Sequence, residues 1–351
     1  MRNQEVLTAT SRPRFRSSAP GIGIVSGGDH IKDAQLKAYQ KYSLNLVGVC
    51  DDRAEATDWT QKRFGVKYMF RDMDELLAHP EIAVVDVTSW PEQPVALIHA
   101  LLEVGKHVLV SKPSASDIHS AEAILRHAQQ RGLTVAVNHH GPWFPAWHIA
   151  PLLLEHKGLG DVLAVTHLHD TPIDWSSMLS TTNPRAEIIA ASSQWIDITN
   201  CWLADKTIAS VRAGNFCSSA QPMKATNPHD AWVEIGCTDG YTILIHRVGC
   251  SRTSSRSHPF WLHGTTGMLR GRMLGADGIE VEDEQGTYRY TLGGSWFPYS
   301  LAGAMNELIC AISDGRQPCN SLAQHLTSLR IMLAACRSAE ADGRLVRLND
   351  V

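Results

Sequence analysis

Apolar and polar positions alternate in regular blocks along residues 21–138. Five short apolar runs recur, and the segments between them carry apolar residues at helical spacing; the runs are GIGIVS, LNLVGVC, IAVVDVTS, HVLVS and LTVAVN. Strand-length apolar runs that alternate with amphipathic helices predict a parallel, doubly wound sheet. Such a sheet binds its ligands where the carboxyl ends of its strands meet.

Glycines end two of the predicted helices, and a turn pattern divides a later segment. VALIHALLEVG ends at Gly105 and SDIHSAEAILRHAQQRG ends at Gly132, as is typical of helix C-termini. In WVEIGCTDGYTILIHRVG, two apolar-rich segments flank Asp239-Gly240, which predicts a β-hairpin. Together with FWLHGTTGMLRG, this hairpin predicts a broad antiparallel sheet whose outer face needs cover, most simply from another subunit.

Composition limits the class of protein. The 351 residues suit two domains, and 44% hydrophobic with 19% charged residues is typical of a globular protein. The net charge of −4, with no lysine–arginine stripe, argues against nucleic acid as a partner. No apolar run approaches the roughly 18 residues that span a membrane. The eight cysteines show no paired or zinc spacing, so we expect reduced cysteines in a cytoplasmic protein.

The first residues differ from the rest of the chain. Residues 1–19 are rich in arginine and serine and lack an apolar segment of the secretory type. We expect a disordered or extended leader, with a transit peptide as the alternative.

Two features after the first and second strands indicate a dinucleotide site. The turn SGGDHI places Ser26 and Gly28 at the first two glycine positions of a dinucleotide fingerprint, and Ile31 at the third. Asp51 follows LVGVC and lies 23 residues after Gly28, near the distance at which an acid binds the adenine ribose. An acid there favours NAD over NADP, although Arg53 is close by. The alternative role of Asp51 is to cap the following helix.

Several segments from residue 20 onward resemble the Gfo/Idh/MocA oxidoreductase family. They are GVCDDRAEATDWTQKRFG, VDVTSWPEQPVALIHALLEVGKHVLVSKP, GLGDVLAV, HGTTGMLRG and NELICAISDGRQPCNSLAQHLTSLRIMLAACRSAEADGRLVRL. The resemblance implies a Rossmann domain at residues 20–141. It also implies a C-terminal α/β domain at residues 142–351 with a large, mostly antiparallel sheet, whose last helices pack back on the Rossmann domain. We therefore expect a homodimer or homotetramer that uses this sheet as an interface.

GKHVLVSKP matches the family motif GKHV-x-x-EKP, which implies that Lys112 is the active-site lysine. A lysine beside a nicotinamide cation and partly desolvated has a lowered pKa, so it can exchange a proton with the substrate hydroxyl. The alternative is a surface lysine. The cofactor, NAD rather than NADP, is expected to contact Ser26, Gly28, Asp51, Arg53, Ser89, Trp90, Ser111, Lys112, Pro113 and Asn138.

Three departures from the family pattern bear on the chemistry. Ser111 replaces the motif's glutamate, and Pro94 replaces a common histidine. The family's Asp, His and Asp at i, i+4 and i+7 on one helix correspond here to Ala190, Gln194 and Asp197. An amide such as Gln194 cannot transfer a proton at neutral pH, so another group must substitute, or the chemistry differs or is absent.

Several histidines lie in the segment in which relatives line their substrate cleft. We predict that His140 and His169 substitute for the family's proton-transfer histidine. Strand periodicity puts His167 and His169 on one face and Asp170 on the other. The alternative for each histidine is a structural or surface role. No metal is expected, because no ligand-specific spacing appears. The predicted catalytic residues are Lys112, His140 and His169; the predicted substrate contacts are Lys112, His140, Trp143, Gln194 and Asp197.

Five tryptophans fall near the expected cleft, and their aromatic faces suit a carbohydrate-like substrate; they are Trp90, Trp143, Trp147, Trp175 and Trp195. The predicted function is NAD-dependent hydride transfer with a secondary alcohol of a sugar, cyclitol or glycoside. Two alternatives remain. One is an NAD-dependent glycosidase that works through transient keto-sugar oxidation and elimination, and the other is a non-catalytic sugar- or NAD-binding regulator.

Overall fold

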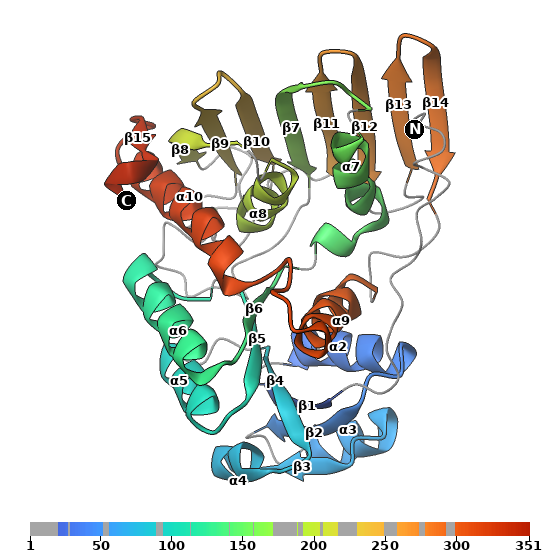
Figure 1. Ribbon diagram of the computed structural model, residues 1–351, viewed down its shortest axis with the longest axis vertical. Helices are drawn as coiled ribbons and strands as arrows, with labels where there is room; N and C mark the ends of the chain where they lie inside the picture. Colours follow the sequence, from blue (N-terminus) through green and yellow to red (C-terminus); the bar gives the residue numbers. More distant parts are fainter. Residues whose placement is uncertain are drawn as a thin grey trace. The chain divides into compact units, whose positions relative to one another are not determined.

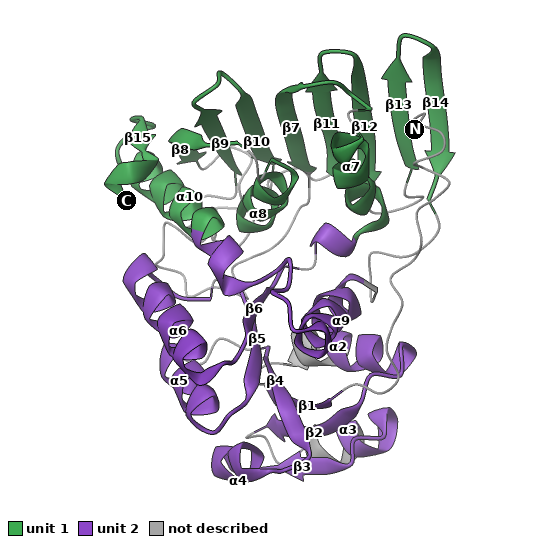
Figure 2. Cartoon of the chain, in the orientation of Figure 1, with its two compact units in different colours: residues 1–11, 144–296, 327–351 green, residues 12–143, 297–326 purple. Residues whose placement is uncertain are grey.

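The described residues form two units, each built on one sheet (Figure 1, Figure 2). The computed structural model describes residues 20–26, 29–51, 56–88, 94–112, 114–139, 141–156, 158–170, 188, 192–203, 206–216, 230–248, 258–273, 278–292 and 299–351. The Rossmann unit comprises residues 12–143 and 297–326, and the second unit residues 1–11, 144–296 and 327–351. No helix in the described ranges is both long and apolar enough to cross a membrane.

Six parallel strands form the sheet of the Rossmann unit in the order β3-β2-β1-β4-β5-β6. They are β1 (Gly21–Ser26), β2 (Leu46–Asp51), β3 (Tyr68–Phe70), β4 (Ile82–Val87), β5 (His107–Ser111) and β6 (Val135–Asn138). This confirms the doubly wound α/β fold. The five predicted apolar runs are β1, β2, β4, β5 and β6, whereas β3 was not predicted because three residues show no periodicity.

Helices cover both faces of this sheet. They are α2 (Asp29–Lys41), α3 (Ala56–Phe64), α4 (Met73–Ala78), α5 (Pro94–Glu103), α6 (Ile118–Arg131) and α9 (Tyr299–Asp314). α5 packs beside α6, and α2 packs beside α9, which comes from far along the chain (Figure 1). The predicted helix-ending glycines are confirmed, because Gly105 and Gly132 both have left-handed φ, of 78° and 66°.

Nine strands form the sheet of the second unit in the order β14-β13-β12-β11-β7-β10-β9-β8-β15. They are β7 (Val162–Asp170), β8 (Ile208–Phe216), β9 (Asp230–Cys237), β10 (Thr242–Val248), β11 (His258–Gly264), β12 (Gly267–Met273), β13 (Gly278–Asp283), β14 (Gly286–Thr291) and β15 (Val346–Arg347). Only the β7–β10 pair is parallel among these described strands, so the sheet is mostly antiparallel, as predicted. The hairpin at Asp239-Gly240 is confirmed, since β9 and β10 pair around it.

The inner face of this second sheet is the one against which helix α8 (Ser193–Trp202) packs, close to α7 (Pro145–Glu155). Strand register places Val165, Ile243 and Ile235 side by side on that face, all buried. The next row along the strands carries His167, and the row after it carries His169 and Arg247. The inner face therefore changes from apolar to polar toward the end of β7.

One ionisable side chain lies inside the Rossmann core. Asp86 on β4 is fully buried, and its Oδ2 accepts hydrogen bonds from Tyr39 Oη and, at 2.8 Å, from Gln35 Nε2, both on α2. Burial raises the pKa of Asp86 to about 7, although the two hydrogen bonds oppose this shift. Near neutral pH, the carboxyl group is therefore close to its own midpoint.

Asp86 makes stability depend on pH in a direction that can be tested. Because its pKa is higher in the folded state, the folded protein holds this proton more tightly, and stability falls from about pH 4 to about pH 7, then levels off. Asp86→Asn removes this titration, so we expect the variant to gain roughly 2–4 kcal/mol relative to wild type across that window. Urea unfolding over the pH range measures the difference. Asp74→Asn, at an exposed position on α4, is the control. A difference that does not vary with pH would contradict the assignment.

Candidate functional site

The carboxyl edge of the Rossmann sheet brings together residues that the sequence predicted for the cofactor. β1 and β2 end at one rung, where Ser26 pairs with Asp51. Asp51 is 2% exposed, so its carboxylate is held inside the edge rather than in solvent. Five predicted cofactor contacts lie outside the described residues; they are Gly28, Arg53, Ser89, Trp90 and Pro113.

On the other side of β1, backbone and hydroxyl groups connect the ends of three strands. Thr88 follows β4, and its N–H and Oγ1 donate to the carbonyl of Val25 at 3.0 and 3.1 Å. Ser111 Oγ donates to the carbonyl of Thr88 at 3.2 Å, and Ser111 pairs with Asn138 at the end of β6. Lys112 is the next residue and is half-buried. The predicted cofactor residues of β5 and β6 therefore lie at one edge.

This edge fits a nicotinamide dinucleotide. Asp51 offers a buried carboxylate to ribose hydroxyls at the end of β2. Asn138 is 6% exposed, and no donor among the described residues meets its Oδ1. A buried amide oxygen of this kind needs a donor, which an amide-bearing ligand can supply.

A buried histidine pair lies beside the predicted residue His140. His140 itself lies outside the described residues, whereas His139 directly follows β6 and its ring contacts the ring of His325. Sequence reasoning did not identify His325, because 186 positions separate the two residues. Their spacing carries no local signal.

The second unit holds the remaining predicted substrate contacts, apart from Trp143. On α8, Gln194 is half-buried and Asp197 is 7% exposed, while Ala190 lies outside the described residues. Trp143 belongs to the Rossmann unit, where it is buried and packs tightly enough that a Cβ on Gly303 would meet its ring at 2.4 Å. Its predicted contact with substrate stays a prediction.

His167 is a structural residue of the second unit. Its Nε2 lies 2.8 Å from Thr199 Oγ1, and that hydroxyl donates its proton to the carbonyl of Trp195. Nε2 of His167 is therefore the donor of the pair. Complete burial lowers the pKa of His167 to about 3, so the ring is neutral in the working range.

His169 accepts from an indole and lies beside a guanidinium. Trp195 Nε1 donates to Nδ1 of His169 at 3.1 Å, while Arg247 Nη1 lies 3.1 Å from Nδ1 and 3.3 Å from Nε2 of the same ring. An indole N–H only donates, so Nδ1 carries no proton, and in the neutral ring Nε2 carries it. In this arrangement His169 would meet a ligand through Nε2–H, as a hydrogen-bond donor. Its predicted part in proton transfer stays a prediction.

His169, Arg247 and His258 together form a polar row on the inner face of the second sheet. The rings of His169 and His258 have centroids 4.3 Å apart, and Arg247 is 1% exposed. Burial, together with the charge of Arg247, lowers the pKa of His258 to about 3. The row therefore combines one buried cation with a neutral His258 and a His169 held in one tautomer.

Two of the tryptophans predicted near the cleft are core residues of the second unit. Trp147 and Trp195 are 0% and 3% exposed, and their rings pack edge to face with centroids 4.7 Å apart. Trp195 nevertheless reaches the polar row through its Nε1. Trp90 and Trp175 lie outside the described residues.

Comparison with known proteins gives consistent matches. Residues 21–139 match the model of the oxidoreductase family GFO_IDH_MocA, NAD-binding Rossmann fold. UDP-N-acetylglucosamine 3-dehydrogenase of Acidithiobacillus ferrooxidans is 27% identical over 197 residues, which are 50% of this chain and 61% of that protein. The match thus spans about three fifths of this curated relative's length.

Solved structures share the fold over nearly the whole chain. An oxidoreductase from Agrobacterium radiobacter in complex with NAD⁺, L-tartaric acid and magnesium has a TM-score of 0.84 at 18% identity, covering 95% of this chain and 99% of that one. Scyllo-inositol dehydrogenase from Lactobacillus casei, with NAD(H) and scyllo-inositol, has a TM-score of 0.77 at 20% identity, covering 95% and 100%. Residues 21–139, with their six-stranded Rossmann sheet, carry the NAD-binding fold of the Gfo/Idh/MocA oxidoreductase family, and the nine-stranded, mostly antiparallel sheet completes the fold that the chain shares with these solved structures.

Proposed function

We propose that this protein is an NAD-dependent oxidoreductase that transfers a hydride between nicotinamide and a secondary alcohol of a sugar, cyclitol or glycoside. The observation that carries the proposal is the joint placement of Asp51 and Lys112 at the carboxyl edge of the family's Rossmann sheet. Relatives named for a nucleotide sugar and for an inositol support a polyhydroxylated substrate. The eight cysteines without paired spacing support a cytosolic location.

Asp51 and Asn138 would hold the cofactor. The carboxylate of Asp51 accepts hydrogen bonds from ribose hydroxyls, and its charge disfavours a 2′-phosphate. Bound NAD⁺ would accept the hydride from the substrate carbon. The chain's own contribution is to orient both reactants and to handle the proton.

Lys112 would bind the substrate hydroxyl. Lys112 is half-buried and adjoins the end of β5, where a lysine could exchange a proton with the substrate hydroxyl. Gln194 and Asp197, both on α8, remain proposed substrate contacts. His140 remains a proposed proton-transfer residue, and the tautomer of His169 suits positioning better than transfer.

The outer face of the second sheet would form the interface of a homodimer or homotetramer. Leu244 on β10 is 40% exposed on the face opposite Ile243 and Ile245. Trp232 and Leu168 share this face, and both are half-buried. The same face also carries Thr166, Glu234 and His246, and another subunit would cover the apolar side chains among these polar ones.

Asp51→Ala tests the cofactor. We expect calorimetry to show NAD bound more tightly than NADP by wild type, and a smaller ratio of the two affinities in the variant, because the charge that repels a 2′-phosphate is gone. Asp72→Ala is the control, since Asp72 caps α4 by accepting from the N–H of Asp74 at 2.9 Å. It should lower stability by about 1 kcal/mol without changing the ratio. Preference of wild type for NADP would contradict the assignment.

Lys112→Ala tests the reaction. NADH formation with a panel of sugars, cyclitols and glycosides should fall by at least about 10²-fold in kcat, while NAD affinity stays within about threefold. Lys112→Arg should not restore turnover, because arginine stays protonated. Lys37→Ala, at an exposed position on α2, should behave as wild type. Turnover that survives Lys112→Ala, or glycoside cleavage by wild type without net NADH, would overturn the proposed reaction.

Leu244→Arg tests the interface. A charge on the outer face should shift the protein toward monomer in light scattering at micromolar concentration, because an unpaired charge is costly to bury. Val104→Arg, at a position 47% exposed in the Rossmann unit, should keep the wild-type mass. A monomeric wild-type protein would rule out this use of the sheet.

A further inference from the structure

Two buried histidines of the Rossmann unit touch at the carboxyl edge of its sheet. His139 is 1% exposed and directly follows β6, and His325 is 4% exposed in the first turn of helix α10 (Leu322–Glu340). Nε2 of His139 lies 3.1 Å from Nδ1 of His325, and the ring planes are tilted by 44°. At this distance one nitrogen donates its proton to the other.

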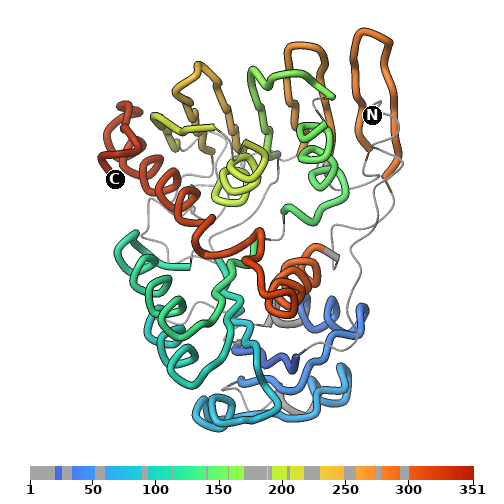
Figure 3. The backbone as a smooth tube through the Cα atoms, viewed as in Figure 1, coloured from blue at the N-terminus to red at the C-terminus, as the bar shows by residue number. Residues whose placement is uncertain are grey.

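The fold holds this contact through the segment that precedes α10. The N–H of Val137 on β6 donates to the carbonyl of Asn320 at 2.8 Å, and Asn320 Nδ2 donates back to the carbonyl of Val137 at 3.1 Å. Ala136 and Ser321 form an isolated antiparallel bridge. The start of α10 therefore runs beside β6 although the two are far apart in the sequence (Figure 3).

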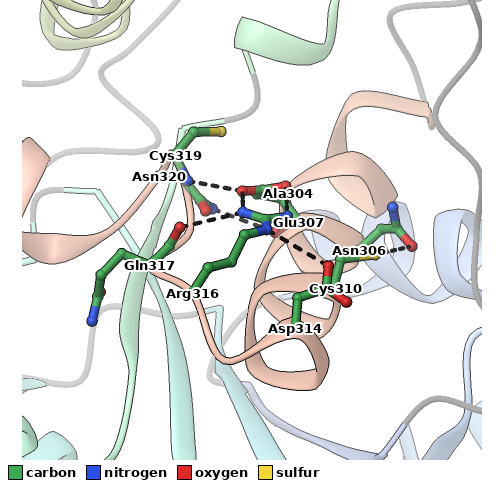
Figure 4. Close-up of polar contacts among 9 residues, drawn as sticks. All are labelled: Ala304, Asn306, Glu307, Cys310, Asp314, Arg316, Gln317, Cys319 and Asn320. Atoms are coloured by element: carbon green, nitrogen blue, oxygen red, sulfur yellow. Dashed lines mark hydrogen bonds and ion pairs between the residues drawn. The ribbon is translucent and has the colours of Figure 1, made fainter.

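Hydrogen bonds also fix the connection from α9 to α10 (Figure 4). Arg316 donates from Nη1 and Nη2 to the two carboxylate oxygens of Glu307 on α9, at 2.6 and 3.0 Å. The N–H of Cys319 donates to Glu307 Oε1 at 2.8 Å. These contacts of the connection with α9 and β6 therefore hold the His139–His325 contact in place.

The pair lies next to Lys112 along the sheet edge. Ser111 of β5 pairs with Asn138 of β6, so the following residues, Lys112 and His139, leave the sheet from the same rung. Neighbouring strands are about 4.8 Å apart. The backbones of the predicted active-site lysine and of the histidine pair are thus neighbours within one unit.

We propose that His139 is the proton acceptor for the substrate hydroxyl bound by Lys112, and that His325 is its positioning and relay partner. This proposal rests on the oxidoreductase function above and answers the loss of a proton-transferring side chain at Gln194. Imidazole exchanges protons near neutral pH, whereas an amide does not. A contacting pair can also pass a proton onward, because each ring can hold a proton at either nitrogen.

In alcohol oxidation the hydroxyl O–H bond would break and its proton would go to Nδ1 of His139. The hydrogen on carbon would leave with its electron pair, and bound NAD⁺ would be the oxidant that takes up this hydride. The Nε2 proton of His139 can pass to Nδ1 of His325, so the pair holds the added proton and its one positive charge. The reverse order serves carbonyl reduction.

His139→Gln and His325→Asn test the pair, because each amide keeps a hydrogen-bonding atom near the ring nitrogen that forms the contact but transfers no proton. We expect kcat to fall by about 10²-fold or more in each, with KM and NAD affinity within about threefold. The double variant should be little slower than either single variant, since the two residues act as one unit. The solvent deuterium isotope effect on kcat should increase.

A second histidine pair of the same unit provides the matched control. Nδ1 of His99 on α5 lies 2.7 Å from Nδ1 of His127 on α6, away from the carboxyl edge. His99→Asn should leave kcat and the isotope effect unchanged. Thermal unfolding of all variants separates loss of folding from loss of proton transfer.

Three outcomes would overturn the proposal. Turnover within about threefold of wild type in His139→Gln would show that the pair takes no part in proton transfer. Additive losses with an unchanged isotope effect would indicate a packing role. Inactivation by a chelator, reversed by Zn²⁺, would show that the two imidazoles hold a metal ion instead. Failure of the wild type to reduce NAD⁺ with any alcohol would instead contradict the function itself, so the two failures are distinguishable.

Discussion

The parallel register of the Rossmann sheet is the constraint on which the chemistry of this unit depends. Parallel strands all leave the sheet at the same edge, so residues remote in sequence meet there. The rung Ser26–Asp51 sets the acid beside the first turn, and the rung Ser111–Asn138 sets Lys112 beside His139. A slip of one residue in either pairing would turn these side chains to the opposite face.

Buried polar groups elsewhere in the molecule are stabilised by hydrogen-bond partners from neighbouring elements. Asp86 receives two donors from α2, which lessens the cost of its burial. In the second unit, Trp195 donates to Nδ1 of His169, and Arg247 lies within 3.3 Å of both nitrogens of that ring. The contact with His169 thus offsets part of the free energy that is needed to bury the guanidinium of Arg247.

Much of the fold could be predicted from sequence periodicity. The apolar runs of β1, β2, β4, β5 and β6, the two helix-ending glycines and the Asp239-Gly240 hairpin are all confirmed. β3 and α4, with three and six residues, are too short to show a period. Tertiary contacts determine whether such short segments form a strand or a helix.

The candidate site was less accessible to sequence reasoning, for two physical reasons. A contact such as that of His139 with His325 depends on how a distant loop crosses β6, and neither residue's neighbours signal it. The tautomer of His169 depends on the indole donor from α8, which residue type alone does not reveal, and the predicted part of His169 in proton transfer stays a prediction. The sequence could predict the face of β7 on which His169 lies, but not which of its ring nitrogens accepts a hydrogen bond.

The replacement at Gln194 has a structural consequence for where proton chemistry can reside. The resemblance implies a histidine on a helix of the second domain, at the position where this chain carries Gln194. Lys112, His139 and His325 all belong to the Rossmann unit and are positioned by β5, β6 and the α9–α10 connection. A proton acceptor in the same unit as the lysine has its spacing set by one rung of the sheet and one connection of the same unit.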